Sequence, residues 1–561
     1  MKGKTLFNRK ALAAVSASLI SAGLLTAVPV ASAASASASA RPLIMESSPE
    51  TAITQDFNPF ALTQAPFGMG ATGLIYEPLI QFDLAQPSTY YPWLATNYAW
   101  SNGGKSVTFT IRSGVKWDDG VALTPADVAF TYNLVKKNPT INLAGLDISS
   151  VSTSGDTVTL TFPTSQYTNL QQIAGVPILP QHIWSSVGNP ALYTDANPVG
   201  TGPYVLSTFT PEGFTLRANP YFWQKDEPKI STVEFPVYTS NTGALTALFA
   251  GQIDWTGNFI PGLQQNFVNK APAYHHYWEA AGSTNALYPN LTKWPTNQLA
   301  VRQAISAAID RTLIASEGEA GLEEPVLNAT GLTLPTYSAW SAPVKSMVNS
   351  AKADASAARS ILEKAGYTLK GGYFYKGSQE VSLTIIDPAA YTDYADDDTI
   401  VAQELKAAGI NATFDGQAVS AWNQDVSDGD FQLTMHWGNG GVTPYNGYNY
   451  WLNSSLATGN SATGDYERVS NSSLDADLVK LAGASTLTEQ TADLVPLEEY
   501  VAANLPVIPT TTASDWFEYN SQYFVGWPTQ ADPYESGQPS GENNNAGSGT
   551  DEVVILHLSP R

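Results

Sequence analysis

The sequence predicts an α/β protein of two lobes with a cleft between them, and three observations lead to this fold class. Up to about Leu287 the chain consists of short, turn-separated segments of alternating hydrophobicity. From Leu287 onward amphipathic helices alternate with strands, and from about Asn504 short Pro-rich strands return. A chain that leaves one lobe, builds a second and comes back must cross between the lobes at least twice, which predicts a hinge and a cleft. The 561 residues also exceed the roughly 300 at which a single core stops growing.

The first 40 residues are expected to be a secretory signal peptide rather than part of the fold. Four basic residues precede an apolar stretch that runs to Val30. The small-residue motif at 31–33 predicts cleavage after residue 33, and an equally readable motif at 38–40 predicts cleavage after residue 40. No later stretch approaches the ~18 apolar residues of a membrane span. We therefore expect a soluble, exported protein in the periplasm or at the cell exterior.

Composition excludes several classes of function. The chain contains no cysteine, which removes disulfides, thiolate nucleophiles and cysteine-held metals, and also the residue that carries a bacterial lipid anchor. Without the signal peptide, 23 bases face 50 acids, a net charge of −27. Such a surface repels phosphate backbones and anionic lipids, so nucleic-acid binding is not expected. The 14 tryptophans and 27 tyrosines suit a wet recognition cleft, although most such rings belong to the core.

In the first half, residues 42–50 predict a short strand, and 105–117 and 147–162 predict antiparallel hairpins. Between them, the adjacent acids Asp118 and Asp119 raise the question of a catalytic carboxylate pair. They precede Gly120 in a tight turn, and neighbouring residues on a turn point apart, whereas paired catalytic carboxylates lie about 5 to 9 Å apart around one bond. The next residues predict a helix with Thr124 as N-cap, Pro125 at its first position and Asp127 three residues after the cap. We interpret these acids as scaffolding.

Two glycines, Gly200 and Gly202, do not form a phosphate loop. A P-loop needs a lysine and a hydroxyl that enter a helix, whereas here Pro203 and Tyr204 lead into a strand-like segment. Further strands follow, and then a helix that ends at Gly251.

The second half predicts helices over 299–314, 355–367 and 399–410, the last two stopped by glycine, and strands over 381–386 and 431–437. The Gly/Asn/Ser-rich run 537–549 predicts a flexible loop, and 553–558 a last strand.

An ordered series of short motifs resembles extracellular solute-binding protein family 5, the oligopeptide/dipeptide-type substrate-binding proteins of ABC importers. The motifs are Phe57-Asn58-Pro59, Tyr76-Glu77-Pro78-Leu79, 114–128, 178–182, 197–204, 219–223, 251–254 and 301–311. The resemblance implies a two-lobed periplasmic-binding-protein-like fold of type II, in its large three-domain variant, with a hinge and an interlobe cleft. It implies a discontinuous domain I (41–75, 195–285 and 510–561), a β-rich domain II (76–194) and an α/β domain III (286–509). Function would be capture of a ligand by domain closure and delivery to an ABC permease.

The loop at 436–451 is the main candidate for ligand contact, because it follows a predicted strand and is rich in glycine. Peptide-binding members of the resembled family often carry a W-G-x-D-x-x-D-P run here, whose acids are associated with a peptide's α-amine. In this chain Gly440 and Thr443 stand at the two acid positions. The ligand therefore stays open between oligopeptide and oligosaccharide, because aromatic faces and amides suit both. The candidate ligand-binding residues are Trp437, Gly438, Asn439, Tyr445 and Asn446, together with Tyr288, Asn290 and Trp294.

Two other classes of protein are alternatives, a secreted hydrolase and a cell-surface structural protein. His275 and His276 do not form an H-E-x-x-H zinc motif, and no G-x-S-x-G motif is present. The clusters 323–324 and 396–398 are interpreted as solvated loop charge. Tandem repeats, which a coat protein would use, are absent from the sequence. We expect a monomer with no enzymatic activity, no metal and no cofactor.

Overall fold

The computed structural model describes residues 41–47, 53–62, 64–86, 89–459, 461–539 and 550–561. Residues 41–561 form one compact unit. The predicted signal peptide, and residues 540–549 of the predicted flexible loop, lie outside the described residues. Within the described part, no helix is long and apolar enough to cross a membrane. The α/β fold class is confirmed by three main sheets with helices packed on them.

A seven-stranded sheet gathers four stretches that are far apart in the sequence. Strand β1 lies inside it and pairs in parallel with both β10 and β11, which sets Leu43 opposite Val233 and Met45 opposite Trp255. These four side chains are buried. The order across the sheet is β12 (His275–Tyr277), β23 (Glu518–Asn520), β11 (Trp255–Thr256), β1 (Leu43–Glu46), β10 (Thr232–Pro236), β9 (Gly213–Ala218) and β8 (Tyr204–Thr210).

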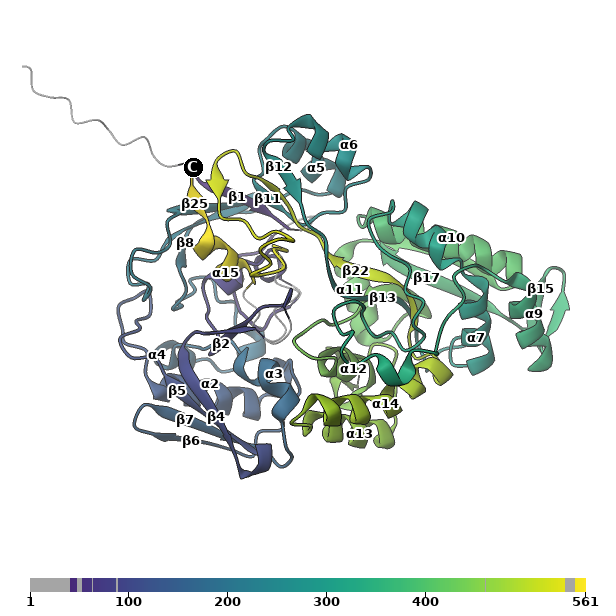
Figure 1. Ribbon diagram of the computed structural model, residues 1–561, viewed down its shortest axis with the longest axis horizontal. Coiled ribbons are helices and arrows are strands. Elements are labelled where there is room, and N and C mark those ends of the chain that lie inside the picture. Colours follow the sequence, from purple (N-terminus) through teal and green to yellow (C-terminus); the bar gives the residue numbers. More distant parts are fainter. Residues whose placement is uncertain (1–40, 48–52, 63, 87–88, 460, 540–549) are drawn as a thin grey trace, which may run out of the picture. The chain divides into compact units, whose positions relative to one another are not determined.

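A four-stranded antiparallel sheet follows the predicted hairpins. Its order is β4 (Ala95–Ser101), β5 (Ser106–Ile111), β7 (Thr157–Thr161) and β6 (Ser150–Ser154). Gly155 lies in the turn between β6 and β7 with φ +60°, a conformation that glycine adopts without strain. Helix α2 (Pro125–Lys137) packs on β6 and β7 (Figure 1).

The question raised by Asp118 and Asp119 is answered by the turn and the helix start. Asp119 Oδ1 accepts a hydrogen bond from the Val121 backbone N–H at 3.0 Å, which closes the turn. Thr124 and Asp127 form a reciprocal capping box at the N-terminus of α2. These acids therefore hold the backbone, as predicted.

Gly200 and Gly202 allow two chain segments to pass in contact. A Cβ at Gly200 would lie 1.8 Å from the Ile75 carbonyl oxygen, and one at Gly202 would lie 2.4 Å from that of Leu74. The Gly202 N–H donates to the Ile75 carbonyl at 2.9 Å. Only glycine fits at so close an approach of two backbones.

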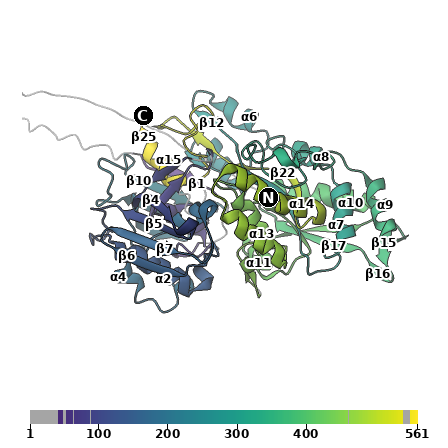
Figure 2. The same cartoon turned by 60° about the horizontal axis from the view of Figure 1, so that its bottom comes forward.

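A mixed five-stranded sheet carries the second half of the chain. Strand β17 pairs in parallel with β18 and β19, while β13 is antiparallel to β19 and β22. Helices α7 (Leu299–Ala308), α9 (Ala355–Lys364) and α10 (Thr392–Ala408) pack on one another, and α10 also contacts β17 (Figures 1 and 2). The order of strands is β18 (Asn411–Gln417), β17 (Ser382–Pro388), β19 (Leu433–Trp437), β13 (Ala280–Pro289) and β22 (Ile508–Asp515).

The prediction of a continuous helix over residues 299–314 is wrong. Helix α7 ends at Ala308, because Ile309 is extended (φ −89°, ψ 140°). Asp310 then caps a new turn, α8 (Arg311–Leu313), by accepting from the Leu313 N–H at 2.8 Å. The apolar period continues through this break, so hydrophobicity alone conceals it.

The interpretation of the acid clusters 323–324 and 396–398 as solvated loop charge is also wrong in part. Asp397 and Asp398 belong to α10 and are fully buried, and Glu323 is 4% exposed. Their neighbours Asp396 and Glu324 do face solvent. The interpretation fails because α10 begins at Thr392, seven residues before the predicted start, so that one face of its acidic first turns points inward.

The last predicted strand is a helix, α15 (Thr550–His557). Residues Val553, Val554 and Ile555 are all buried. An apolar run that is buried on every side has no amphipathic period, and its β-branched residues therefore favoured a strand.

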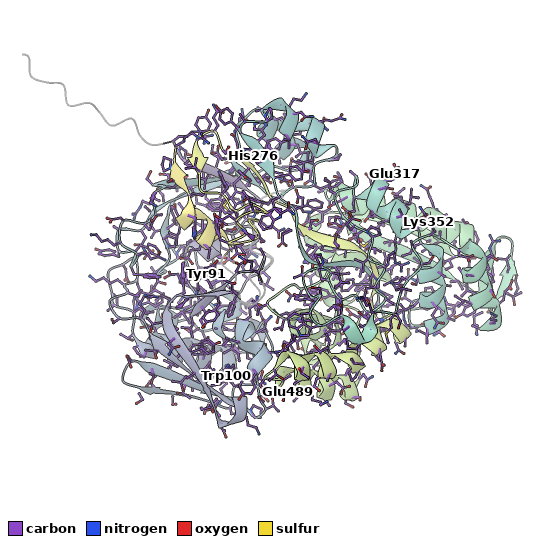
Figure 3. All side chains as sticks on the ribbon, in the orientation of Figure 1. Tyr91, Trp100, His276, Glu317, Lys352 and Glu489 are labelled. Carbon is purple, nitrogen blue, oxygen red and sulfur yellow. The ribbon has the colours of Figure 1, made fainter. Side chains whose placement is uncertain are left out.

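Helix α14 (Leu487–Asn504) begins with a second capping box, in which Glu489, labelled in Figure 3, bonds back to the Thr486 backbone. The other helices are α1 (Ala65–Gly68), α3 (Leu170–Ala174), α4 (Gln181–Trp184), α5 (Asn241–Phe249), α6 (Leu263–Asn266), α11 (Val419–Asp428), α12 (Tyr445–Leu452) and α13 (Ser472–Ala482). The other strands are β2 (Ile80–Phe82), β3 (Tyr90–Pro92), β14 (Thr368–Lys370), β15 (Tyr373–Lys376), β16 (Gln379–Glu380), β20 (Ala457–Thr458), β21 (Ser461–Ala462), β24 (Phe524–Val525) and β25 (Ser559–Pro560).

Candidate ligand-binding site

A cavity of about 850 Å³, partly open to solvent, lies among the described residues. Its wall combines segments that follow β1 and β11 of the seven-stranded sheet with β13, β19 and β22 of the five-stranded sheet. The start of α10 adds Tyr391, Asp393 and Tyr394. A cavity of this size, with aromatic and polar walls, is typical of a small-molecule site.

Trp437 lies at the end of β19 and lines this cavity. Its backbone pairs with Asn285 of β13, and its carbonyl accepts from the Tyr288 hydroxyl at 2.9 Å. The indole is half-buried, with the rings of Tyr394 and Trp422 centred 6.3 and 5.9 Å away. A fixed backbone and flanking rings hold the indole face in one orientation.

Glu323 lies at the centre of a hydrogen-bonded network in the cavity wall. Its Oε1 accepts from the Ser514 backbone N–H at 2.8 Å, and its Oε2 accepts from Asn285 Nδ2 at 2.9 Å. Asn285 Oδ1 in turn accepts from the Tyr394 hydroxyl at 2.9 Å. Burial raises the pKa of Glu323 from 4.5 to about 8.

Two further acids, Asp393 and Asp515, line the same cavity. Burial raises the pKa of Asp393 to about 6. Gly282 leaves room for the Asp515 side chain, because a Cβ at residue 282 would lie 2.1 Å from Asp515 Oδ1. No lysine, arginine or histidine is among the described residues that line the cavity. The wall therefore presents carboxyl groups and no basic side chain among its described residues.

Other predicted site residues lie close to Trp437 but not in this wall. Gly438 and Asn439 line a second cavity of about 250 Å³. Tyr288 is fully buried and accepts from Trp451 Nε1 at 2.6 Å while its hydroxyl supports the Trp437 carbonyl. These three remain predictions as ligand contacts.

The remaining predicted residues have partners within the protein. Asn290 Nδ2 donates to the Gly429 carbonyl at 2.9 Å, and Trp294 Nε1 donates to the Glu380 carbonyl at 3.0 Å. In α12, Asn446 Nδ2 donates to Gln171 Oε1 at 2.7 Å, and the Tyr445 ring is buried. A role for these four in ligand contact is likewise still a prediction.

Sequence reasoning missed Asn285, Glu323, Asp393 and Tyr394. Glu323 belongs to a segment without helix or strand, where no periodicity marks a buried position. One sequence signal for these residues was available: Asp393 and Tyr394 follow the predicted strand 381–386, and loops after strands often carry binding residues. Within the described ranges, no three His, Cys, Asp or Glu side chains are grouped so as to hold a metal ion.

The fold and this cavity define the class of extracellular solute-binding proteins. The sequence profile of the bacterial extracellular solute-binding proteins, family 5, matches residues 89–460, about two thirds of the chain. The chain therefore belongs to this family, whose members are substrate-binding components of ABC importers and are periplasmic or extracellular.

Curated relatives agree with this assignment. The nickel-binding periplasmic protein of Escherichia coli (strain K12) is 27% identical over 68% of this chain and 73% of that protein. The probable peptide-binding protein YejA of Agrobacterium fabrum is 24% identical over 82% of this chain and 85% of its own. Both relatives are binding proteins by name.

Two solved structures share the fold. A periplasmic oligopeptide-binding protein of Thermotoga maritima, with mannohexaose bound, superposes with a TM-score of 0.82 at 24% identity, over 93% of this chain and 98% of that one. The oligopeptide-binding protein AppA of Bacillus subtilis, in complex with a nonapeptide, gives 0.77 at 19% identity, over 93% and 99%. At these identities the likeness carries the fold alone.

Proposed function

We propose that this protein captures oligopeptides in the cavity beside Trp437 and delivers them to the membrane subunits of an ABC importer. The observation that carries the peptide assignment is the acidic wall, made by Glu323, Asp393 and Asp515 without a basic residue among the described lining. The loop after β19 lacks the two acids expected of peptide-binding members, and these three carboxyl groups from other segments replace them as partners for an ammonium group.

The cavity wall also supplies what a peptide of variable sequence requires. Backbone amides and carbonyls of a bound peptide can pair with the polar side chains Asn241, Asn258 and Ser283, while Trp437 and Trp516 offer apolar faces for its side chains. Capture needs no catalytic group, and we propose that no bond is made or broken.

Oligosaccharide binding is the second candidate. The rings of Tyr391, Trp437, Phe259 and Trp516 together with the wall amides suit a sugar's faces and hydroxyls, and the Thermotoga maritima neighbour was solved with mannohexaose. The acidic wall favours the peptide, because a carboxyl group can form an ion pair with a peptide's ammonium group, whereas a neutral sugar offers no such partner.

The wider organisation is proposed on the same basis. Residues 1–40 act as a cleaved export signal, and the mature monomer, which has no cysteine to lipidate, is retained near the membrane by other means. Domains I, II and III keep the predicted boundaries, and the ligand is enclosed by closure of domain I on domain III. The cavity supports this, since its wall draws on residues predicted in both domains.

Native mass spectrometry of the purified mature protein, followed by denaturation and identification of the released molecule, tests the proposal. Peptides of mixed sequence are expected. Hexose-spaced masses would establish the oligosaccharide candidate instead, and hydrolysis products that accumulate with time would reveal an enzyme.

A further inference from the structure

Glu323 is a buried carboxyl group that faces the cavity, and both of its oxygens are already oriented by the protein. Ser514 N–H and Asn285 Nδ2 donate to the two oxygens. The segment that carries Glu323 is fixed by a bridge between Pro325 and Thr511 of β22. The carboxyl group is therefore held in place before a ligand arrives, which is the condition for selective recognition.

Among the described residues, the titratable groups that interact with Glu323 are acids or phenols. Glu319 and Asp397, which share a hydrogen bond, interact with it electrostatically, as do Asp393 and Tyr394 of α10 and Glu279 in the segment that leads into β13. Burial and these neighbours raise the pKa of Glu319, Asp397 and Glu279 well above their ordinary values. An array of this kind holds protons while the cavity is empty, because desolvated like charges in contact cannot all ionise.

We infer that a cationic group of the ligand takes the place of a proton at Glu323, so that capture releases a proton to solvent. The inference rests on the proposed function, since it requires a ligand with an ammonium or guanidinium group. In the step, the O–H bond of the Glu323 carboxyl breaks and the proton passes to water or buffer. The ligand keeps its own protons and pairs with the carboxylate.

The exchange avoids a buried unpaired charge in both states. The empty cavity holds a neutral acid, and the filled cavity holds an ion pair, so neither state has to desolvate a lone carboxylate. Proton and ligand compete for one site, so affinity is lowest in acid and rises as the pH approaches about 8, the pKa of Glu323 in the empty protein. For one exchanged proton the increase is at most about tenfold per pH unit. The affinity for a neutral ligand would not rise with pH through this proton exchange.

The first experiment asks whether an amine is required. Mature protein freed of bound ligand by unfolding and refolding is incubated with a tryptic digest of serum albumin, half of it untreated and half fully acetylated on its amines. Retained peptides are identified by mass, and only those without arginine are compared, because acetylation leaves a guanidinium group charged. The untreated peptides should be retained at least tenfold over their acetylated counterparts at pH 7.5, and the ratio should shrink at pH 5.5.

The second experiment counts protons. The most strongly retained peptide is synthesised and titrated by calorimetry at pH 7 in phosphate and in Tris, whose ionisation enthalpies differ. A group with a pKa of about 8 is about nine-tenths protonated at pH 7, so close to one proton should be released per peptide. The readout uses the unaltered protein and so does not depend on any variant folding.

Variants then assign the proton. Glu323→Gln should abolish both proton release and the rise of affinity with pH, whereas Glu324→Gln, an exposed neighbour, should retain both. Asp393→Asn should retain most of the release. Release that persists in Glu323→Gln and disappears in Asp393→Asn would overturn the assignment to Glu323.

The outcomes separate the two proposals. Equal retention of acetylated and untreated peptides, with no proton released, refutes the exchange while the peptide function stands. Retention of neither digest, with mannohexaose bound in a parallel titration, refutes the peptide function and the exchange together.

Discussion

Glu77→Gln tests whether buried carboxyl pairs make this protein an acid-stable one. Glu552 of α15 and Glu77 share a hydrogen bond and are both fully buried. Gln81 Nε2 donates to Glu552 Oε2 at 2.7 Å, and Trp223 Nε1 donates to Glu77 Oε1 at 2.7 Å. A glutamine at 77 keeps the acceptor for Trp223 and offers an amide N–H to Glu552, so it mimics the protonated form of Glu77 at every pH.

The magnitude follows from the pKa of Glu77, which burial raises from 4.5 to about 7. Below pH 4.5 the folded and unfolded states both hold the proton, and the stabilisation is fully present. Between pH 4.5 and 7 the unfolded chain has lost a proton that the folded protein still binds, so stability falls as the pH rises. The loss amounts to about 3 kcal/mol by pH 8, at ~1.36 kcal/mol per pKa unit. The pKa of Glu552, raised well above its ordinary value, extends the loss above pH 7.

Urea unfolding of both proteins at pH 4.5 and pH 8 measures the difference. Glu77→Gln should match the wild type within about 1 kcal/mol at pH 4.5 and exceed it by about 3 kcal/mol at pH 8, because it removes the titration of Glu77. Glu363→Gln, an exposed glutamate of α9, is the control and should follow the wild type at both pH values. Parallel loss of stability in the wild type and Glu77→Gln would refute the buried proton on Glu77.

Three further predictions concern the cavity and the packing. Trp437→Ala should weaken binding of the captured ligand at least about tenfold, measured by tryptophan fluorescence titration, because a wall ring contributes about 1.5 kcal/mol or more; unchanged affinity would remove Trp437 from the site. That ligand at a hundredfold excess over Kd should raise the unfolding free energy by about 2.7 kcal/mol, and an unaltered melting curve would show that the molecule does not bind the folded state. Gly200→Ala should cost at least about 2 kcal/mol by overpacking, whereas Gly188→Ala, where a Cβ meets nothing within 4 Å, should cost less than about 1 kcal/mol; equal melting temperatures would contradict the steric argument.

Sequence patterns predicted the structural elements that depend on residues close together in the sequence. The hairpin across Gly155 and the capping box of Thr124 and Asp127 depend on residues within a few positions of each other, and both are present. The change from short strands to alternating helices and strands near Leu287 predicted an α/β region, and the five-stranded sheet lies there. The family was predicted from the fixed order of short motifs along the chain, and the match over residues 89–460 confirms it.

The cavity wall could not be predicted in this way, because its parts meet only in three dimensions. Glu323, Asp393 and Asp515 are far apart in the sequence, and burial rather than local pattern determines their state. A charged residue is solvated in most proteins, so buried acids such as Asp397 contradict the usual expectation. Helix α15 was missed because its surroundings, and not its own β-branched residues, decide its conformation.

The seven-stranded sheet has a consequence for the order in which the chain is made. Strand β23, near the C-terminus, lies between β11 and β12, so β12 has no neighbour in this sheet until almost the whole chain is available. The four-stranded sheet, by contrast, uses only residues 95–161 and is complete early in synthesis. Pairing of such distant strands is slow, and closure of the sheet therefore waits until residues 518–520 are available.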